Sequence, residues 1–239
     1  MKRSTNPLYD YFKNNKHNLI NKWLHYFDIY NKYFEKFRKK EVVILEFGIS
    51  HGGSLQMWKH YFGKRARIIG VDINPECKKL KESQVEVYIG SQEDRDFLKK
   101  LMKKIGEVDI IIDDGGHTMN QQICTFQETY KFVKPGGIYL TEDLHTSYWP
   151  DFGGGLRKQG TFIEYSKMMI DQLHAWYSRD PGSLQVDDFT RTTPAIHFYD
   201  SIVVFEKAVV AEPSHQQIGA PQLSILEKSD YRQKSAPIY

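Results

Sequence analysis

The chain has 239 residues, 40% of them hydrophobic, which is enough for one domain with a full core and one elaborated segment. Lys and Arg (33) nearly balance Asp and Glu (30), and the net charge of +3 argues against a dedicated nucleic-acid binder. No stretch is apolar enough for a membrane span or a signal peptide, and the two cysteines do not suggest a disulfide framework, so we expect a cytoplasmic protein.

The first 40 residues are expected to form an N-terminal helical segment. Aromatic residues recur at helical spacing between positions 18 and 39, from Trp23 to Phe37. This spacing predicts a helix whose aromatic face packs on the rest of the domain, with a partner surface as the alternative. The basic run that closes it is expected to be a solvated helix end.

Residues 41–207 are expected to form the main domain, because apolar runs alternate there with amphipathic stretches. The predicted strands are 41–48, 67–75, 85–91, 108–115 and 134–143. The predicted helices are 54–62, 76–83, 93–105 and 119–133. Near the end, 195–199 and 202–207 flank a turn, which predicts an antiparallel hairpin. The order predicts an α/β fold: a Rossmann-like, doubly wound, mostly parallel sheet that ends in the hairpin.

Residues 150–193 interrupt this alternation before the hairpin. They contain a loop with three successive glycines at 153–155 and an amphipathic helix over 161–179. An insertion at this place predicts a lid or an oligomer contact, and we expect a homo-oligomer. The tail at 208–239 has no clear period and is not assigned any structure.

Unusual polar residues follow four of the predicted strands. Ligands of an open parallel sheet bind beyond the carboxyl ends of its strands, where these residues should meet. Clustered carboxylates at the ends of buried strands cost energy, so they indicate a counter-ion or chemistry. The residues at this rim are Glu46 to Ser54 after the first strand, Asp72 after the second, Asp113, Asp114 and His117 after the fourth, and Glu142 and Asp143 after the fifth.

The turn from Glu46 to Ser54, "EFGISHGGS", is rich in glycine and leads from a strand into a helix. Such a turn brings backbone amides close to a ligand. A dinucleotide fingerprint requires a second glycine where Ser50 stands, which weakens an NAD interpretation. Asp72 lies 20 residues after Gly52, where a carboxylate can hold ribose hydroxyls. A tight turn followed by a strand-end acid, without a ligand, is the structural alternative.

The stretches "LEFGISHGGS", "GVDINP" and "IGSQED" resemble the S-adenosylmethionine-binding motifs of class I methyltransferases. The resemblance implies that Glu46 lies near the methionine end of the cofactor. It implies that Asp72 binds the ribose and that Gln92 contacts the adenine. Asp113, which ends the strand nearest the methionine, is assigned to the cofactor side as well. The loop positions that match the motif are Gly48, Ser50, Gly52 and Ser54.

The stretches "IDDGGH" and "TEDLHTSYW" resemble a narrower branch. It holds the magnesium-dependent macrolide-sugar O-methyltransferases, the rhamnosyl O-methyltransferases and the cephalosporin hydroxylase-type proteins. The resemblance covers about residues 40–150, and one departure from the motif is glycine at position 116. It implies that Asp114, Glu142 and Asp143 bind Mg²⁺ and that His117 is the catalytic base.

The residue chemistry agrees with these roles. Carboxylate oxygens suit Mg²⁺, and an imidazole is a suitable base near neutral pH. The alternatives are a His117 that only hydrogen-bonds nearby backbone and a Glu142–Asp143 pair that only caps the next segment. His145, Tyr148 and Trp149 are expected either to line the acceptor site or to pack in the core.

The sequence therefore predicts a Mg²⁺-dependent O-methyltransferase that uses S-adenosylmethionine. The expected acceptor is a sugar hydroxyl of a small-molecule glycoside or of a surface-polysaccharide precursor, and neither nucleic acid nor a membrane is an expected partner. The main alternative is a non-catalytic cofactor-binding module in a biosynthetic complex. An NAD-dependent oxidoreductase is a third reading, which Ser50 disfavours.

Overall fold

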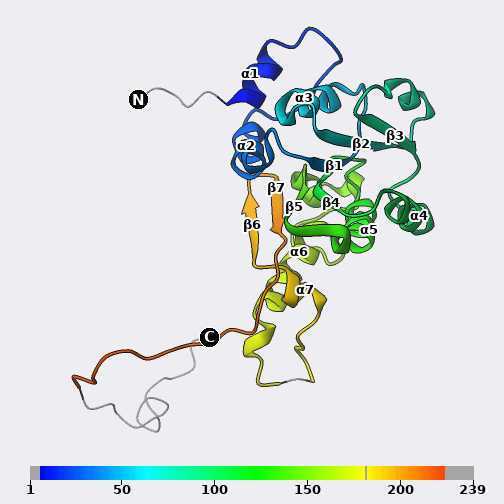
Figure 1. Cartoon of the computed structure of the whole chain (residues 1–239). Helices are drawn as coiled ribbons and strands as arrows, with labels where there is room; N and C mark the ends of the chain where they lie inside the picture. The colour runs from blue at the N-terminus through cyan, green and yellow to red at the C-terminus, as the bar shows by residue number, and fades with distance from the viewer. Residues whose placement is uncertain (1–5, 181, 224–239) are drawn as a thin grey trace.

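A computed structural model of the chain describes residues 6–180 and 182–223. One seven-stranded sheet in the order β3-β2-β1-β4-β5-β7-β6 runs through the domain (Figure 1). The first five strands are parallel, and β6 and β7 form an antiparallel hairpin beside β5. The strands are β1 (Val42–Phe47), β2 (Ala66–Asp72), β3 (Val85–Ile89), β4 (Val108–Asp113), β5 (Val133–Thr141), β6 (Ala195–Tyr199) and β7 (Ile202–Glu206). The predicted fold class is confirmed.

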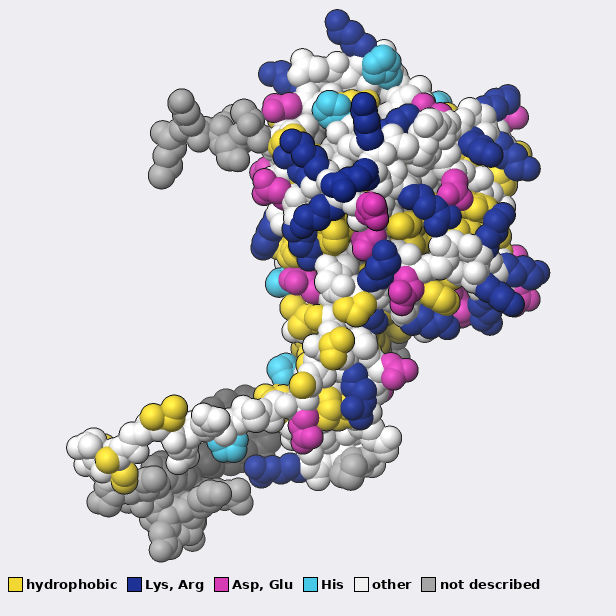
Figure 2. Space-filling model, in the orientation of Figure 1, with side chains coloured by type: hydrophobic (Ala, Val, Ile, Leu, Met, Phe, Trp, Pro, Cys, Tyr) yellow, Lys and Arg dark blue, Asp and Glu magenta, His cyan; other side chains and the backbone are white. Residues whose placement is uncertain are grey.

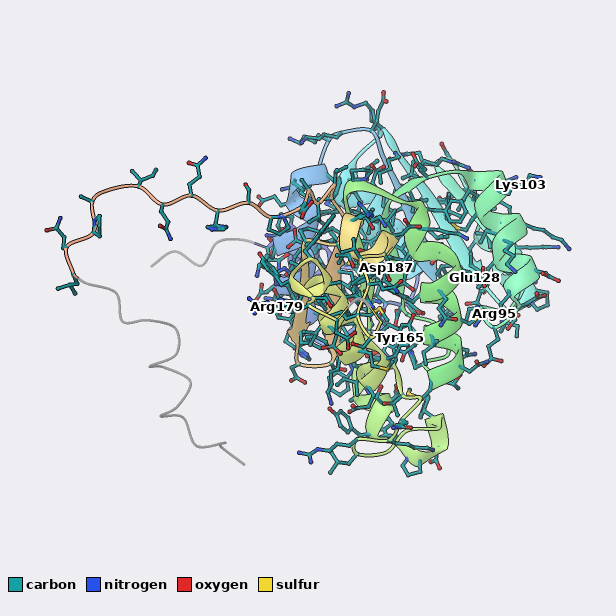
Figure 3. The ribbon with its side chains drawn as sticks, turned by 90° about the horizontal axis from the view of Figure 1, so that it is seen from below. Arg95, Lys103, Glu128, Tyr165, Arg179 and Asp187 are labelled. Carbon is teal, nitrogen blue, oxygen red and sulfur yellow. The ribbon has the colours of Figure 1, made fainter. Side chains whose placement is uncertain are left out.

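Helices cover both faces of the sheet (Figure 1). On one face, α1 (Pro7–Lys13), α2 (Tyr26–Phe34) and α3 (Gly53–Phe62) bury their apolar side chains in one core. On the other face, α4 (Arg95–Ile105), α5 (Met119–Thr129) and α6 (Phe162–Leu173) share a second core. An ion pair of 2.7 Å between Arg95 of α4 and Glu128 of α5 joins two neighbouring helices of this layer (Figure 3).

The register of the parallel strands brings their carboxyl ends to one edge. Phe47 of β1 pairs with Val71 of β2 and with Asp113 of β4, and Asp113 pairs with Thr141 of β5. The loops that follow these strands therefore leave the sheet side by side. They form the rim predicted from the sequence, and the site is built on it.

The helix predicted over 18–39 is shorter than expected. The structure has α2 from Tyr26 to Phe34 and a 3-10 turn η1 (Glu35–Phe37), while 18–25 contains neither helix nor strand. The aromatic face of α2 packs on the domain as predicted, with Tyr26, Tyr30 and Phe34 fully buried. The prediction was wrong for 18–25 because this segment runs over the rim, where Lys22 contacts carboxylates more than 90 residues away in the chain.

Two further elements differ from the predicted ones. Helix α1 lies in the predicted N-terminal helical segment but was not predicted as a separate helix, although Asn6 caps it and Pro7 begins it, which is a regular start signal. The helix predicted over 76–83 is a 3-10 turn, η2 (Pro75–Leu80), capped by Asn74. A short 3-10 turn is enough to connect β2 and β3.

The insertion at 150–193 contains the 3-10 turns η5 (Pro150–Phe152) and η6 (Ala175–Tyr177), helix α6 and the short helix α7 (Asp188–Thr192). Phe162 of α6 is fully buried, and Tyr165 and Met169 pack against the same core. Helix α6 is thus a part of the core layer. A lid role for the rest of the insertion stays a prediction.

The surface carries charges of both signs. Lys and Arg side chains lie among Asp and Glu side chains over the face shown in Figure 2. In the described residues, no helix has the length and apolar character needed to cross a membrane. Of the tail that was not assigned any structure from the sequence, 208–223 contains no helix or strand, and 224–239 lies outside the described residues.

Candidate active site

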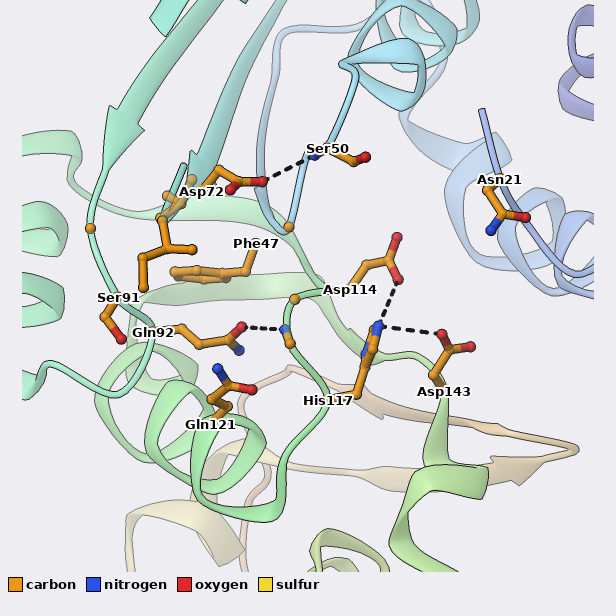
Figure 4. Close-up of a pocket in the computed structure, with 16 residues that line it drawn as sticks. Asn21, Phe47, Ser50, Asp72, Ser91, Gln92, Asp114, His117, Gln121 and Asp143 are labelled. Atoms are coloured by element: carbon orange, nitrogen blue, oxygen red, sulfur yellow. Dashed lines mark hydrogen bonds and ion pairs between the residues drawn. The ribbon is translucent and has the colours of Figure 1, made fainter. Parts of the chain in front are cut away.

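A cavity of about 390 Å³ opens at the carboxyl rim (Figure 4). Its volume is in the range of small-molecule sites. Loops after β1, β2, β3, β4 and β5 contribute to its wall, together with one residue of the segment 18–25. Its lining residues include Asn21, Phe47, Gly48, Ser50, Asp72, Ile73, Ser91, Gln92, Asp114, Gly116, His117, Gln121 and Asp143.

The loop after β4 comes very close to the loops after β1 and β3 at two glycines, Gly48 and Gly115. Gly48 has φ +82°, and a Cβ there would lie 2.0 Å from the backbone oxygen of Asp114. A Cβ at Gly115 would lie 1.7 Å from Oε1 of Gln92. Gly48 and Gly115 therefore let the loops after β1 and β3 pack against the loop after β4.

Asp72 lies at the end of the cavity that β2 and β3 form. Its Oδ2 accepts hydrogen bonds of 3.0 Å from the backbone amides of Ile49 and Ser50, and its Oδ1 accepts one from Asn74. The carboxylate thus fixes the Gly-rich loop and still lines the cavity. The exposed side chain of Ile73 stands beside it, a neighbour that sequence reasoning did not select.

Gln92 connects the loop after β3 to the loop after β4. Its Nε2 donates to Oδ1 of Asp113 (2.9 Å) and to the hydroxyl of Thr125, and its Oε1 accepts from the amide of Gly116. Asp113 is fully buried and does not line the cavity, so the structure gives no support to its direct assignment to a cofactor. Burial raises the pKa of Asp113 to about 7.

Glu46 and Ser54 lie below the cavity surface. The Ser54 hydroxyl donates to Oε2 of Glu46 over 2.8 Å, and Glu46 is fully buried. Gly52, in a left-handed conformation, begins α3 and faces Leu80. Of the loop positions predicted to bind cofactor, Gly48 and Ser50 line the cavity, while Glu46, Gly52 and Ser54 support the loop from behind.

Asp114, His117 and Asp143 meet at the opposite end of the cavity. One ligand atom of each lies within 4.8 Å of the others, a spacing that could hold a metal ion. Nε2 of His117 is 3.4 Å from Asp143 and 3.9 Å from Asp114 (Figure 4). The Thr146 hydroxyl donates to the backbone oxygens of both His117 and Asp143, which joins the two loops.

The backbone at this end is strained. His117 has φ +57° and Asp143 has φ +55°, in the left-handed region that non-glycine residues rarely adopt. Such conformations persist where the surroundings impose them, and they often mark functional sites. Burial lowers the pKa of His117, although the neighbouring acids act in the other direction. The imidazole is therefore neutral near pH 7 and able to accept a proton.

Glu142 lies on the other side of Asp114, next to Lys22. Nζ of Lys22 contacts both carboxylates, with 2.8 Å to Oε2 of Glu142. The hydroxyl of Tyr30 donates to Glu142 Oε1 over 2.6 Å. Burial, and then the charge of Asp114, raise the pKa of Glu142 to about 8. The buried ammonium of Lys22 thus lies within 4.0 Å of three carboxylates, those of Asp114, Glu142 and Glu46.

Sequence reasoning missed the side chains that hold the carboxylates. Lys22 is in the segment predicted as a helix, and Tyr26 and Tyr30 were expected only to pack. Instead, the hydroxyl of Tyr26 donates to Oδ1 of Asp143 over 2.7 Å. No local pattern distinguishes these residues from the other polar and aromatic residues near them, so only the fold identifies them.

A second cavity, of about 210 Å³, lies beside the carboxylates, and Trp23 forms part of its wall. Trp23 packs edge-on against His145 with 5.8 Å between ring centroids, and His145 packs against Trp149 at 4.6 Å. Trp23 and Trp149 are 55% and 48% exposed, which excludes core packing for Trp149. The three rings form an accessible aromatic wall next to the acidic end of the first cavity.

Known proteins similar to this chain include methyltransferases, in agreement with the residues of this site. No protein-family model matches the chain. The MycE methyltransferase of mycinamycin biosynthesis, solved in complex with Mg and SAH, has the same fold with a TM-score of 0.78. That match has 29% identity and covers 97% of this chain and 60% of MycE. The fold is thus that of class I methyltransferases.

Curated relatives narrow the class. Demethylmacrocin O-methyltransferase of Streptomyces fradiae is 34% identical over 81% of this chain and 52% of its own length. A rhamnosyl tetracenomycin-C 2'-O-methyltransferase of Streptomyces olivaceus is 35% identical over 74% of this chain and 49% of its own length. The chain belongs to the class I methyltransferases and is homologous to these sugar O-methyltransferases, which confirms the resemblance. It spans about half the length of the curated relatives it matches.

Proposed function

We propose that this protein is an O-methyltransferase that moves the methyl group of S-adenosylmethionine to a sugar hydroxyl of a glycoside or of a surface-polysaccharide precursor. One observation carries the proposal: a single cavity joins Asp72, at a place suited to ribose hydroxyls, to the Asp114–His117–Asp143 group. The relatives that carry the same activity in their names support the proposal.

The cavity is in the size range of small-molecule sites, and the order of the groups along it suits the cofactor. Asp72 would bind the ribose hydroxyls, with Ile73 and Ser91 beside the base. Gly48 and Ser50 would face the sugar and the methionine chain. The amide group of Gln92 is already hydrogen-bonded to Asp113, Thr125 and Gly116. We therefore assign Gln92 to positioning the loops after β3 and β4 and not to a direct contact with the adenine. Glu46 would affect the cofactor indirectly, by fixing the Gly-rich loop through its hydrogen bond with Ser54.

The acidic end of the cavity fits a hard divalent cation. Asp114, Glu142 and Asp143 offer carboxylate oxygens, the ligands that Mg²⁺ prefers. Asp114 and Glu142 already share a positive group, the ammonium of Lys22, which indicates that their oxygens face a common cationic position. When bound, Mg²⁺ would hold adjacent hydroxyls of the acceptor and lower the pKa of one of them.

His117 then acts as the general base. Its neutral imidazole accepts the proton of the acceptor hydroxyl as the oxygen attacks the methyl carbon. A new C–O bond forms and the sulfonium C–S bond breaks, which leaves a neutral thioether that needs no acid. Asp143, 3.4 Å from Nε2 of His117, stabilises the imidazolium that results. The residues of the cavity wall supply orientation, which accounts for much of the rate.

The side chains around the acidic end of the cavity indicate the class of acceptor. Aromatic rings stack on the apolar faces of sugars. Trp23 offers such a ring in the wall of the second cavity, and His145 and Trp149 continue the row of rings beside it. The mixed charges of the surface do not favour nucleic acid. The predicted homo-oligomer and cytoplasmic location remain proposals.

S-adenosylhomocysteine should raise the melting temperature of the protein, and NAD should not. Ligands that bind only the folded state stabilise it according to their concentration and affinity. The measurement is a thermal shift with each compound at equal concentration. Stronger stabilisation by NAD would contradict the proposal. Stabilisation by S-adenosylhomocysteine without methyl transfer to any of a panel of glycosides would favour a non-catalytic cofactor-binding module.

Asp72→Ala should weaken the binding of S-adenosylhomocysteine by about 5- to 150-fold, because a buried group that loses a charged hydrogen-bond partner costs about 1–3 kcal/mol. Part of the loss should come from the Gly-rich loop, since Asp72 also accepts from Ile49 and Ser50. Titration calorimetry gives the affinity, and circular dichroism checks the fold. Asp151→Asn, in the exposed turn η5, is the matched control. An unchanged affinity would contradict the assignment.

A further inference from the structure

Lys22 is the positive group of the candidate active site. Its Nζ contacts Oδ2 of Asp114, lies 2.8 Å from Oε2 of Glu142 and is 4.0 Å from Oε1 of Glu46. The side chain is only 3% exposed. Three carboxylates surround the amine, and these ion pairs hold it in place as an ammonium.

This ammonium uses the same oxygens that the proposed metal site needs. A divalent cation bound to Asp114 and Glu142 would lie within contact distance of Nζ. Two positive centres a few ångströms apart repel strongly in a buried site. The carboxylate oxygens of Asp114 and Glu142 that accept hydrogen bonds from Lys22 are also less available to bind a metal. The two cations therefore exclude each other at this pair of carboxylates.

The segment that carries Lys22 has few polar contacts with the rest of the domain, although Ile20 packs against the core. Residues 18–25 belong to no helix or strand, and Trp23 and Leu24 are more than half exposed. The hydrogen bond from the Asn18 amide to Gln56 on α3 is long, at 3.4 Å. The contacts of Lys22 are thus the strongest polar interactions described between this segment and the rim.

We propose that Lys22 is a resident counter-ion that holds Asp114 and Glu142 in the metal-free protein and that a divalent cation must displace. The proposal rests on the metal site of the proposed function and adds a residue that sets its affinity. Asn21 lines both cavities and Lys22 lines the second, so displacement of Lys22 moves a wall that the two cavities share. Metal binding and access to the cavities are therefore linked through the segment 18–25.

The first test measures Mn²⁺ binding, by the electron paramagnetic resonance of free Mn²⁺, in the full chain without cofactor. Lys22→Met and Lys22→Gln should bind Mn²⁺ about tenfold more tightly, or better, because a buried competing charge is removed. Lys16→Met, at an exposed position of the same N-terminal segment, should bind like the unmodified protein. Equal or weaker binding in the Lys22 variants would overturn the proposal, and the metal site itself would stand.

The second test needs no substitution, so it remains valid if the Lys22 variants do not fold. Hydrogen exchange of the unmodified protein is followed with and without Mg²⁺. Amides of 18–25 should exchange several-fold faster with Mg²⁺, while those of β1 and β4 stay protected. Unchanged or slower exchange in 18–25 at saturating metal would overturn the proposal. If no variant binds Mn²⁺ and exchange does not respond to Mg²⁺, both the proposal and the metal part of the proposed function are wrong.

Discussion

Asp114→Asn should strongly lower the rate of metal-dependent methyl transfer and leave S-adenosylhomocysteine bound. Asp114 lies between Lys22 and His117. Its Oδ2 contacts Nζ of Lys22, and its Oδ1 lies 3.9 Å from Nε2 of His117. Loss of its charge removes a ligand that no neighbour can replace. Since a catalytic metal contributes several kcal/mol of transition-state stabilisation, we expect a rate loss of about 10²-fold or more.

The cofactor should be retained in this variant, because the groups that surround Asp72 are at the other end of the cavity. Activity is measured with and without a chelator, and Mn²⁺ binding and S-adenosylhomocysteine binding are measured separately. Asp151→Asn, a charge loss at an exposed position, is the control. Full activity of the unmodified protein in the chelator would remove the metal from the mechanism. Loss of cofactor binding in Asp114→Asn would show that the loop after β4 has collapsed.

Strand positions and the rim could be predicted from the sequence because their signals are local. Runs such as Ile110–Ile112 are buried on both faces of the sheet, and their apolar character reveals them. Parallel strands bring their carboxyl ends together whatever the details of packing, so Asp72, Asp114 and Asp143 were placed in one site. The hairpin followed from alternation and a short turn.

The depth of a side chain below the rim could not be predicted in the same way. Glu46 lies one residue before the end of β1 and Asp113 ends β4, each next to a residue that lines the cavity, yet both are fully buried. Which of two adjacent acids faces a ligand depends on the pleat and on partners such as Gln92, which is 21 residues away from Asp113 in the chain. A sequence pattern gives the cluster and leaves these roles undecided.

The segment 18–25 could not be predicted for a similar reason. The aromatic spacing of α2 extends to Trp23 in the sequence, and it suggests one longer helix. Lys22 forms its ion pairs with residues 92 and 120 positions further along the chain. These long-range contacts are consistent with an extended path across the rim, and the preference for a helix at these residues is only a few tenths of a kcal/mol per residue.

His117→Asn should lower the rate by about 10²- to 10⁴-fold, the usual contribution of a positioned general base. Asparagine is the preferred substitution because position 117 has φ +57°, a conformation that asparagine tolerates better than alanine. The variant thus keeps the loop and removes the base. Asp114 and Asp143 remain, so Mn²⁺ and S-adenosylhomocysteine should bind with affinities close to those of the unmodified protein.

The pH profile separates a base from a merely structural residue. Burial lowers the pKa of His117, so the unmodified enzyme should lose activity only when the pH falls below the usual range of histidine, as the imidazole becomes protonated. That acid limb should disappear in His117→Asn, and higher pH should partly restore the rate, since hydroxide can then remove the proton. A weaker Mn²⁺ affinity would instead make His117 a metal ligand, as its place within 4.8 Å of both acids allows. An unchanged rate would show that His117 has only a structural role in its loop, where its backbone oxygen accepts a hydrogen bond from Thr146.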